Sequence, residues 1–264
     1  MFVVIKKKHI VLSIITIIII VTLFILGKAY LKSKGTLNEN HHGYIAIVID
    51  DFGNDSKGTE EMMNIGIPFT AAIMPFMSSS VKDSEKAKEK GIETIVHLPM
   101  EPEKGKSSWL GPKGITVDLK DEEIKNRVEA AFDEVNSAVG LNNHMGSKAM
   151  KDKRVVGIIM GVLKEKDKIF LDSKTTSSRE AEEAAKSLGV KYYGRNIFID
   201  NNKDIGSIEK QLDKAAHLAI KEGSAIAIGH VGVEGGVVTA NAIKNKVPEL
   251  KKKGIEFVYL SQMP

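Results

Sequence analysis

The sequence predicts an α/β protein with parallel strands and helices outside them, arranged as a barrel or as an open sheet. Three observations indicate this fold class. Strand-like and helix-like stretches take turns about seven times from residue 44 onward. The strand-like runs end in polar residues, as strands do where they deliver side chains to a site. The composition is 42% hydrophobic and 27% charged, which is ordinary for a globular protein with a buried core.

The segment before this alternation has the composition of a membrane anchor. Three lysines precede an apolar run from Ile10 to Leu26, which spans roughly 26 Å as a helix, near the thickness of a hydrocarbon core. Basic residues before such a run predict a cytoplasmic N-terminus. The predicted organisation is residues 1–9 in the cytoplasm, 10–27 as a transmembrane anchor, 28–43 as a polar linker and 44–264 as the domain.

A cleaved signal peptide is the rival interpretation of this segment, because its basic start and apolar stretch suit one equally. Residues Gly27-Lys28-Ala29 make a poor cleavage site, which favours the uncleaved anchor. We therefore expect a single-pass protein of the cell membrane whose domain lies outside the cytoplasm. If the N-terminus is cleaved, the domain is secreted instead.

The first half of the alternation begins with an apolar run at residues 44–50, which is the first predicted strand. The stretches that follow are helix 56–65, strand 67–74, helix 81–90, strand 92–97, loop 99–117, helix 121–136 and a short segment at 138–145. The helix at 121–136 opens with three acids, which suit the positive end of a helix dipole. The loop at 99–117 carries proline, glycine and the only tryptophan, Trp109.

The second half continues the same pattern to the end of the chain. Its stretches are helix 152–165, strand 168–172, helix 178–188, strand 190–199, helix 207–221, strand 224–229, helix 239–253 and strand 256–260. Ser177-Ser178 is a suitable cap for the helix at 178–188, and Gly189 ends it. No tandem repeat, phosphate-binding loop or GxGxxG motif follows any of these strands.

Charge and cysteine content exclude several classes of function. The net charge of +4 comes mostly from scattered lysines, without an arginine-rich block, so nucleic acid is not an expected partner. The chain has no cysteine, which excludes disulfides, thiolate nucleophiles and cysteine-type zinc sites. Any metal must therefore be held by His, Asp or Glu. No Gly-x-Ser-x-Gly elbow is present, which argues against a serine hydrolase.

Polar residues after the strands are expected to share one rim, because right-handed crossovers place every strand-to-helix loop on one face. These residues are Asp50, Asp51, His97, Glu101, Asn142, Asn143, His144, Asp172, Asp200 and His230. Adjacent carboxylates such as Asp50-Asp51 repel, and burying them requires a metal, a shared proton or a basic partner. The alternative is that these two acids cap the following helix.

A metal site on this rim would use oxygen and imidazole ligands. Asp51, His97 and His144 make a three-ligand set that leaves a position open for water, which is typical of a catalytic site. Such ligands suit zinc first, or manganese, iron, cobalt or nickel. Glu101 is an alternative ligand, because four residues after His97 it returns to the same side of a strand or helix.

Five segments resemble the divergent polysaccharide deacetylase family, relatives of the NodB-homology (family 4) carbohydrate esterases. The segments are Ile49-Asp50-Asp51-Phe52-Gly53, His97 to Pro102, Asn142 to Ser147, Leu171 to Thr176 and Ile228-Gly229-His230. The resemblance covers about residues 44–262. It implies a NodB-like distorted (β/α) barrel of about seven parallel strands, preceded here by one transmembrane helix. It also implies metal-dependent removal of N- or O-acetyl groups from a glycan or peptidoglycan.

The resemblance also implies roles for individual residues. Asp50 matches the general base, Asp51 the acidic metal ligand and His97 the first histidine of the His-x-x-x-His motif, whose second position is Glu101 here. His230 matches the general acid.

Further supporting roles are expected on the same rim. Asn143 is a candidate donor to the oxyanion, and Asp172 or Asp200 is expected to orient His230. Trp109 is expected either to stack on a sugar ring or to pack within its own loop.

Two other functions remain open from the sequence. One is a non-catalytic envelope protein that binds glycan or acts as a scaffold, which the altered metal motif favours. The other is an esterase or amidase that acts on a non-glycan substrate.

Overall fold

The computed structural model describes Thr22, residues 43–233 and residues 235–264. The predicted cytoplasmic segment, anchor and linker lie outside the described residues, apart from Thr22 and Gly43. Within the described ranges, no helix combines the length and the apolar character needed to cross a membrane. The unit from His42 to Pro264 is compact and carries every element discussed below.

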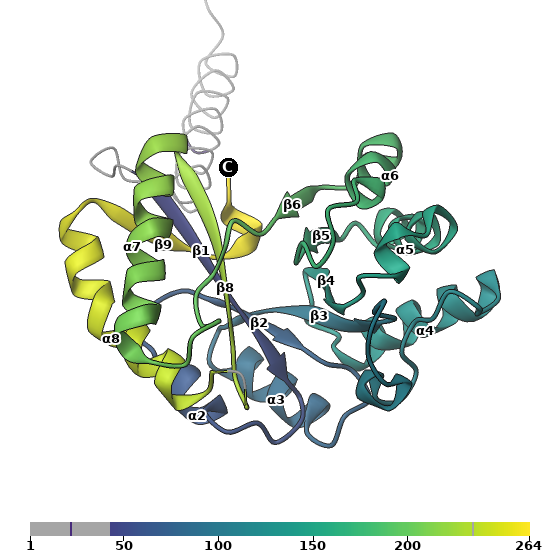
Figure 1. The fold of residues 1–264 in the computed structure, drawn as a ribbon, viewed down its shortest axis with the longest axis horizontal. Coiled ribbons are helices and arrows are strands. Elements are labelled where there is room, and N and C mark those ends of the chain that lie inside the picture. Colours follow the sequence, from purple (N-terminus) through teal and green to yellow (C-terminus); the bar gives the residue numbers. More distant parts are fainter. Residues whose placement is uncertain (1–21, 23–42, 234) are drawn as a thin grey trace, which may run out of the picture. The chain divides into compact units, whose positions relative to one another are not determined.

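Nine strands in the described residues form one curled sheet in which every pairing is parallel. Along the sheet they are β6 (Tyr192–Gly194), β5 (Ile169–Asp172), β4 (Gly140–Met145), β3 (Glu93–Met100), β2 (Thr70–Ile73), β1 (Gly43–Phe52), β8 (Ser224–His230) and β7 (Ile197–Phe198), while β9 (Ile255–Val258) also pairs with β1. Figure 1 shows the sheet curving around the centre of the molecule. The predicted parallel α/β architecture is confirmed.

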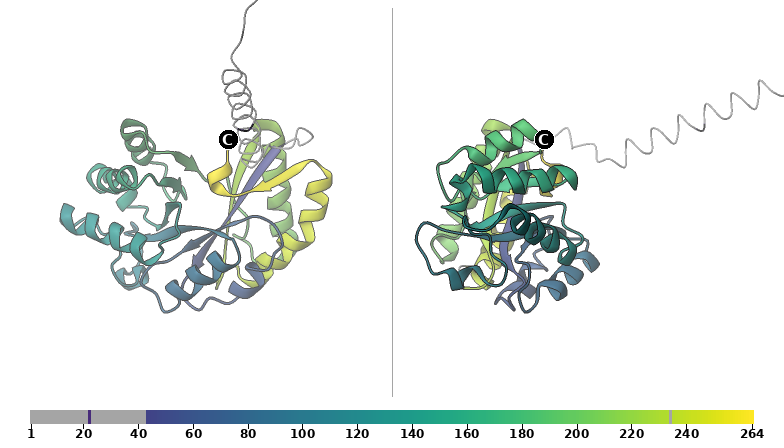
Figure 2. Two further views of the ribbon diagram at one scale, coloured as in Figure 1. Left: turned by 180° about the vertical axis from the view of Figure 1, so that it is seen from behind. Right: turned by 90° about the vertical axis from the view of Figure 1, so that its right-hand side faces the viewer.

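The helices lie on the outside of this curve (Figures 1 and 2). They are α2 (Thr59–Met62), α3 (Ser80–Glu89), α4 (Asp121–Glu134), α5 (Lys153–Glu165), α6 (Glu180–Leu188), α7 (Ile205–Glu222) and α8 (Val237–Lys252), with 3-10 turns η1 (Ser107–Leu110), η2 (Ala149–Lys151) and η3 (Leu260–Gln262). Two caps explain where helices begin: the side chains of Asp152 and Asp204 accept backbone N–H groups at the starts of α5 and α7.

Strand β1 is buried on both of its faces, which explains its continuous apolar run. Ile45, Ile47 and Ile49 pack in the larger core between sheet and helices. Tyr44, Ala46 and Val48 pack in a second, smaller core. Because side chains alternate along a strand, Asp50 continues the second series and faces the concave side of the sheet. The first of the two acids is therefore delivered to the interior by strand geometry alone.

Several element boundaries differ from those predicted. The helix expected at 56–65 is only the four-residue α2, which follows Gly58 in the left-handed region at φ 91°. The strand expected at 92–97 continues through Pro99 to Met100, paired with β4. The strand expected at 190–199 was wrong as a single element. It is two short strands, β6 and β7, which pair with β5 and β8 at the two ends of the sheet order.

Residues Arg195 and Asn196 cross between these two sheet edges. The N–H of Arg195 donates to Asp172 O at 2.9 Å, on the β5 side, and the N–H of Asn196 donates to Ile226 O at 3.0 Å, on the β8 side. Within the described sheet, β6 and β7 do not pair with each other. The curled sheet is therefore joined at this seam by the covalent chain rather than by a strand ladder, which makes it an incompletely closed barrel.

Candidate metal and proton-transfer site

The end of β1 places Asp50 and Asp51 in different environments. Asp50 is buried and in register with His230 on β8. Asp51 has a φ of 69°, in the left-handed region that a non-glycine residue seldom adopts. The register of β1 against β2 is irregular between Ile49 and Phe52. This irregular backbone turns Asp51 toward β3 and β4 instead of continuing the alternation of the strand.

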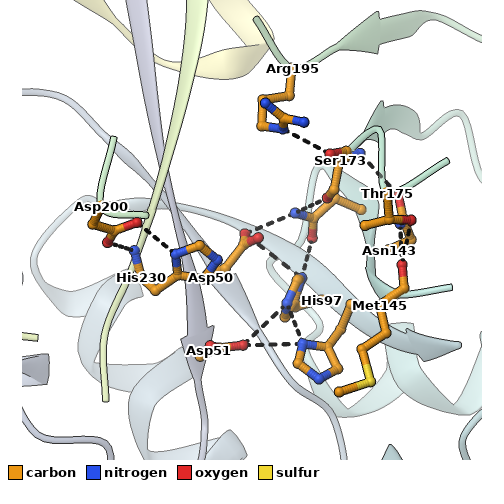
Figure 3. A network of polar contacts seen from close by, with 12 residues as sticks. Asp50, Asp51, His97, Asn143, Met145, Ser173, Thr175, Arg195, Asp200 and His230 are labelled. Atoms are coloured by element: carbon orange, nitrogen blue, oxygen red, sulfur yellow. Dashed lines mark hydrogen bonds and ion pairs between the residues drawn. The ribbon is translucent and has the colours of Figure 1, made fainter. Parts of the chain in front are cut away.

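Three ligand-type atoms from three strands converge at this point (Figure 3). Asp51 Oδ1 lies 3.3 Å from His97 Nε2 and 3.2 Å from His144 Nδ1. The two imidazole nitrogens lie 3.1 Å apart. Ligand atoms held about 2.0–2.1 Å from a tetrahedral zinc ion lie about 3.3 Å from one another. The spacing of the three atoms therefore fits one small divalent ion.

The hydrogen bonding of Asp51 leads to the same conclusion. Its Oδ1 is buried and has no hydrogen bond of acceptable geometry within the described residues, although two imidazole nitrogens face it. A buried carboxylate oxygen without a partner is costly, and a cation removes that cost. Burial raises the pKa of Asp51, but His144 and His97 outweigh it and lower the pKa below its ordinary value, so the group is ionised and ready to ligate.

Asn142 lies between the candidate ligand His97 and the candidate base Asp50. This fully buried side chain donates from Nδ2 to Asp50 Oδ1 at 2.8 Å. Its Oδ1 lies 2.8 Å from His97 Nδ1. An amide oxygen only accepts, so Nδ1 of His97 carries the proton and Nε2 presents its lone pair to the ligand cluster. The sequence placed Asn142 on the rim but gave it no role, although strand alternation puts it on the same face of β4 as His144.

The pKa values of Asp50 and His97 reflect this burial. Burial is the main reason that the pKa of Asp50 is raised, which makes its carboxylate a better proton acceptor. Burial lowers the pKa of His97, but the carboxylates of Asp50 and Asp51 outweigh it and the net shift is upward.

His230 and Asp200 form a second pair on the other side of Asp50 (Figure 3). His230 Nδ1 lies 2.9 Å from Asp200 Oδ1, and the backbone N–H of His230 donates to Asp200 Oδ2 at 2.7 Å. Thr239 also donates to that oxygen, at 2.9 Å. Burial lowers the pKa of His230, but Asp200 outweighs it and raises the pKa to about 9. The imidazole is therefore protonated at neutral pH and has a proton to give.

These groups surround a common cavity of about 240 Å³. The residues that line it are Asp50, Asp51, His97, Asn143, His144, Met145, Ser173, Thr175, Phe198 and His230. A larger cavity of about 420 Å³ adjoins it, since Asp51 and His144 line both. The site thus combines a ligand cluster, a buried carboxylate and a protonated imidazole around one cavity that lies beside a second.

The structure places the remaining predicted site residues outside this cluster of ligand atoms. Glu101 accepts from Lys148 Nζ at 2.6 Å and from the N–H of Val117 at 2.9 Å, so it supports loops instead of the ligand group. Asp172 accepts from Tyr192 and from the N–H of Lys174. Of the two acids considered for orienting His230, Asp200 is the one in contact.

Asn143 and Trp109 have distinct positions. The Nδ2 of Asn143 donates to Met145 O at 2.7 Å and to Thr175 Oγ1 at 3.2 Å, and its Oδ1 accepts from the N–H of Ser173. With both donors used in this way, Asn143 holds the loops after β4 and β5 together. Trp109 lines the larger adjoining cavity and is 55% exposed.

A curled parallel barrel with an Asp-His-His cluster at the carboxyl ends of its strands is the architecture of NodB-like carbohydrate esterases. Comparison with known families agrees, because residues 47–263 match the model of the divergent polysaccharide deacetylases. The chain belongs to the divergent polysaccharide deacetylase family.

Two curated relatives are uncharacterized. A protein of Haemophilus influenzae is 35% identical over 186 residues, which cover 70% of this chain and 66% of that protein. The protein YibQ of Escherichia coli K12 is 34% identical over 188 residues, which cover 71% of this chain and 58% of YibQ. The matched region thus spans less than two thirds of the length of these relatives.

Solved structures with low sequence identity share the fold. The uncharacterized protein ATU2773 of Agrobacterium tumefaciens C58 has a TM-score of 0.76 at 19% identity, with coverage of 85% of this chain and 90% of that one. A mutant of BA3943, described as a family 4 pseudoenzyme with restored activity, has a TM-score of 0.53 at 10% identity. The match covers 85% of this chain and 68% of that one. A family 4 carbohydrate esterase of Streptomyces lividans, in complex with acetate, has a TM-score of 0.50 at 11% identity. The match covers 84% of this chain and 95% of that one.

Proposed function

We propose that this protein is a metal-dependent hydrolase that removes acetyl groups from a cell-envelope polysaccharide, acting outside the cytoplasm. The observation that carries the proposal is the convergence of Asp51 Oδ1, His97 Nε2 and His144 Nδ1, all within 4.8 Å of one another. Membership of the deacetylase family and the shared fold support the same reaction class.

The ligand cluster fits zinc, because one carboxylate and two imidazoles leave a coordination position for water. When bound there, the metal would acidify that water and polarise the acetyl carbonyl. Asp51, His97 and His144 would hold it, and Asn142 keeps Nε2 of His97 directed at it. Glu101 is not needed as a ligand, because His144 completes the set of three.

Proton transfer is assigned to the two groups that flank the cluster. Asp50, whose pKa burial raises, accepts the proton of the attacking water. His230, whose pKa Asp200 raises to about 9, donates a proton to the leaving amine or alkoxide. The two residues are register partners on adjacent strands, so an acetylated unit between them meets both groups.

A decisive experiment combines metal analysis with acetate release. The full chain is purified, its metal content is measured, and acetate is followed from chitooligosaccharides, acetylated xylan and peptidoglycan with and without added zinc. We expect one ion per chain and zinc-dependent acetate release from at least one glycan. Stoichiometric metal with no acetate from any of them would refute the hydrolase proposal.

A non-catalytic glycan-binding protein is the second candidate function. The observation that favours it is the fold shared with BA3943, a protein described as a pseudoenzyme whose mutant regained activity. Glycan binding without acetate release in the same experiment would select this function.

A further inference from the structure

Asp83 is a buried carboxylate that the proposed reaction does not use. It lies in the first turn of α3, and only 3% of its surface is exposed. In the part of the chain that the structure describes, the groups that donate to its side chain are neutral. They are the Gly53 N–H, at 2.9 Å, and the Ser79 hydroxyl, at 3.0 Å. A carboxylate is costly to bury with neutral donors alone, so the position of those donors indicates what the residue does.

The start of α3 forms hydrogen bonds with the turn after β1 instead of capping its own helix. The side chain of Ser79, the N-cap residue of α3, makes no cap hydrogen bond to that helix. Its hydroxyl accepts from the N–H of Asp55 at 2.8 Å, and its backbone N–H donates to Gly53 O at 2.8 Å. A serine at this position usually accepts from the first turn of its own helix. Here the two side chains, Ser79 and Asp83, bind residues 53–55.

The turn that they bind has an unusual backbone. We name residues 51–55 the Asp51 turn. Asp51, Gly53 and Asp55 all have positive φ, at 69°, 103° and 45°. A methyl group at Gly53 would lie 2.6 Å from Met74 O, so the turn also packs closely against the residue that follows β2. Left-handed backbone at non-glycine residues persists only where the surrounding structure fixes it. The contacts from Ser79 and Asp83 supply that constraint.

The position of one metal ligand depends on this turn more than the positions of the other two. His97 and His144 lie within the regular ladder between β3 and β4. Asp51 lies where the register of β1 against β2 is irregular, between Ile49 and Phe52. Its Oδ1 must nevertheless lie beside both imidazoles, at 3.3 and 3.2 Å. A displacement of the Asp51 turn would therefore move this oxygen and leave the two histidines in place.

We infer that Asp83 is a positioning residue for the metal ligand Asp51. Its carboxylate holds the Asp51 turn through Gly53 and Ser79, and the turn directs Asp51 Oδ1 toward the two imidazoles. This inference rests on the metal-dependent function proposed above. It gives α3 a role in the site, although none of the residues that line the two cavities belongs to that helix.

The first test measures zinc affinity of the full chain by calorimetry. Asp83→Ala removes the acceptor of both donors, so its dissociation constant for zinc should rise by about tenfold or more. Asp83→Asn keeps one side-chain oxygen for the Gly53 N–H and the Ser79 hydroxyl. Its zinc affinity should therefore stay close to that of the parent chain.

A matched aspartate separates this role from a general effect on stability. Asp152 also lies at the start of a helix, α5, and its side chain accepts the N–H groups of Arg154 and Val155, each at 3.0 Å. Asp152→Ala should lower the Tm of the metal-free chain, because a helix cap is lost. Its zinc affinity should not change. Asp83→Ala should lower both quantities.

The second test reports on the geometry of the site and needs no turnover. Cobalt(II) is bound in place of zinc, and its visible absorption depends on the number and arrangement of its ligands. Asp83→Ala should change this spectrum relative to the parent, whereas Asp83→Asn and Asp152→Ala should preserve it. A change confined to the folding of α3, with Asp51 in its parent position, would leave the spectrum as it is.

Ser79→Ala provides a second variant in case Asp83→Ala does not fold. It removes the acceptor of the Asp55 N–H and leaves the bond between Gly53 and Asp83 in place. We expect a smaller loss of zinc affinity than in Asp83→Ala. No side-chain cap of α3 is lost with this hydroxyl. Parent zinc affinity and an unchanged cobalt spectrum in Ser79→Ala would then count against the inference and overturn it.

The outcomes distinguish this inference from the proposed function. Folded Asp83→Ala with the zinc affinity and cobalt spectrum of the parent would overturn the positioning role and leave the proposed hydrolase standing. Weakened zinc binding in Asp83→Ala, with no acetate released by the parent chain, would support the positioning role and refute the hydrolase. A parent chain that binds neither zinc nor cobalt would overturn both.

Discussion

Asn142 is the residue on which the candidate base and one candidate ligand both depend. Its single amide donates to Asp50 and accepts from His97, each at 2.8 Å. No other buried side chain named in the site makes contact with both groups. The residue therefore links the position of the proton acceptor to the orientation of the metal ligand, and the two links can be separated by substitution.

Asn142→Asp should preserve one link and break the other. A carboxylate at this position still accepts from His97 Nδ1, so zinc affinity should stay within about tenfold of the parent chain. It cannot donate to Asp50 and places two carboxylates in contact, so kcat should fall by about a hundredfold. Zinc affinity by calorimetry and kcat by acetate release check this.

Asn142→Leu and Asn143→Asp serve as comparisons for that variant. Asn142→Leu removes both links, so zinc affinity and kcat should fall together, by about 10–100-fold each. Asn143→Asp alters a neighbouring buried amide that contacts loops and not the ligands, so it should lower thermal stability without separating the two measurements. Equal losses of affinity and kcat in Asn142→Asp would contradict the linking role.

The pKa of His230 predicts the alkaline limit of activity. Because Asp200 raises this pKa to about 9, the imidazole keeps its proton through neutral pH, and kcat should decline as pH rises past about 9. In Asp200→Asn the carboxylate is gone and burial remains, so the pKa falls and the decline should begin at lower pH. A pH profile of acetate release for both chains checks this, and an unshifted limit in the variant would exclude His230 as the acid.

The raised pKa of His230 also predicts how the stability of the folded chain depends on pH. The folded pKa is raised above the ordinary value of 6.5. The His230–Asp200 pair therefore contributes its full stabilisation below about pH 6.5 and loses it as pH rises through about 9. Asp200→Asn should remove this pH dependence from the thermal unfolding of the metal-free chain.

At the scale of elements, the loop between β8 and α8 holds the Asp200 carboxylate in position beside His230. A methyl group at Gly235 would lie 2.2 Å from Thr239 Oγ1 and 2.4 Å from Asp200 Oδ2. Neither distance is sterically possible, so any side chain at this position displaces the carboxylate that orients His230. The glycine-rich stretch after β8 is thus a packing requirement of the His230–Asp200 pair.

Gly235→Ala should therefore lower kcat by about tenfold to a hundredfold while zinc affinity is retained. Gly157→Ala is the matched control, because nothing lies within 4 Å of a methyl group there and the residue is inside α5. The Gly157→Ala variant should raise the free energy of unfolding by about 0.5–1 kcal/mol and leave kcat unchanged. Acetate release and thermal unfolding of both variants check the pair of outcomes.

Sequence patterns predicted the elements well where they are long and apolar. The apolar run at 44–50 and the polar residues after it identified β1 and the position of Asp50 at its end. A strand that is buried on both faces is apolar along nearly its whole length. The strand expected at 190–199 failed, because composition does not reveal that Arg195 and Asn196 cross between sheet edges. The helix expected at 56–65 was overestimated, because α2 begins only after the left-handed Gly58 and already ends at Met62.

The candidate site was predictable in its ligands and less so in its supporting residues. Asp51, His97 and His144 lie in the carboxyl-terminal halves of β1, β3 and β4, so their convergence on one side of the sheet follows from parallel topology. Asp172 and Asp200 both follow strands, and only the coordinates show that Asp200 meets His230. The sequence does not reveal the left-handed backbone of Asp51, because Asp is common both at strand ends and in turns.

At the scale of the whole molecule, metal should stabilise the folded chain. Zinc at about a hundredfold excess over its dissociation constant adds about 2.7 kcal/mol, which raises Tm by about 5–10 °C for a domain of this size. Asp51→Asn should lose this response, while its metal-free Tm stays close to that of the parent, because Asn tolerates the left-handed backbone. Scanning calorimetry with zinc and with chelator checks both, and an equal zinc response in the variant would remove Asp51 from the ligand set.

The crossing at Arg195 and Asn196 limits how far the β5 and β8 edges of the sheet can move apart. Two residues span at most about 7 Å when fully extended, and each is also fixed by its N–H to a different edge of the sheet. The circumference of the curled sheet is thus limited by bond lengths at one place. A longer insertion between these two residues is accordingly the most direct way to let the β5 and β8 edges of the sheet move apart.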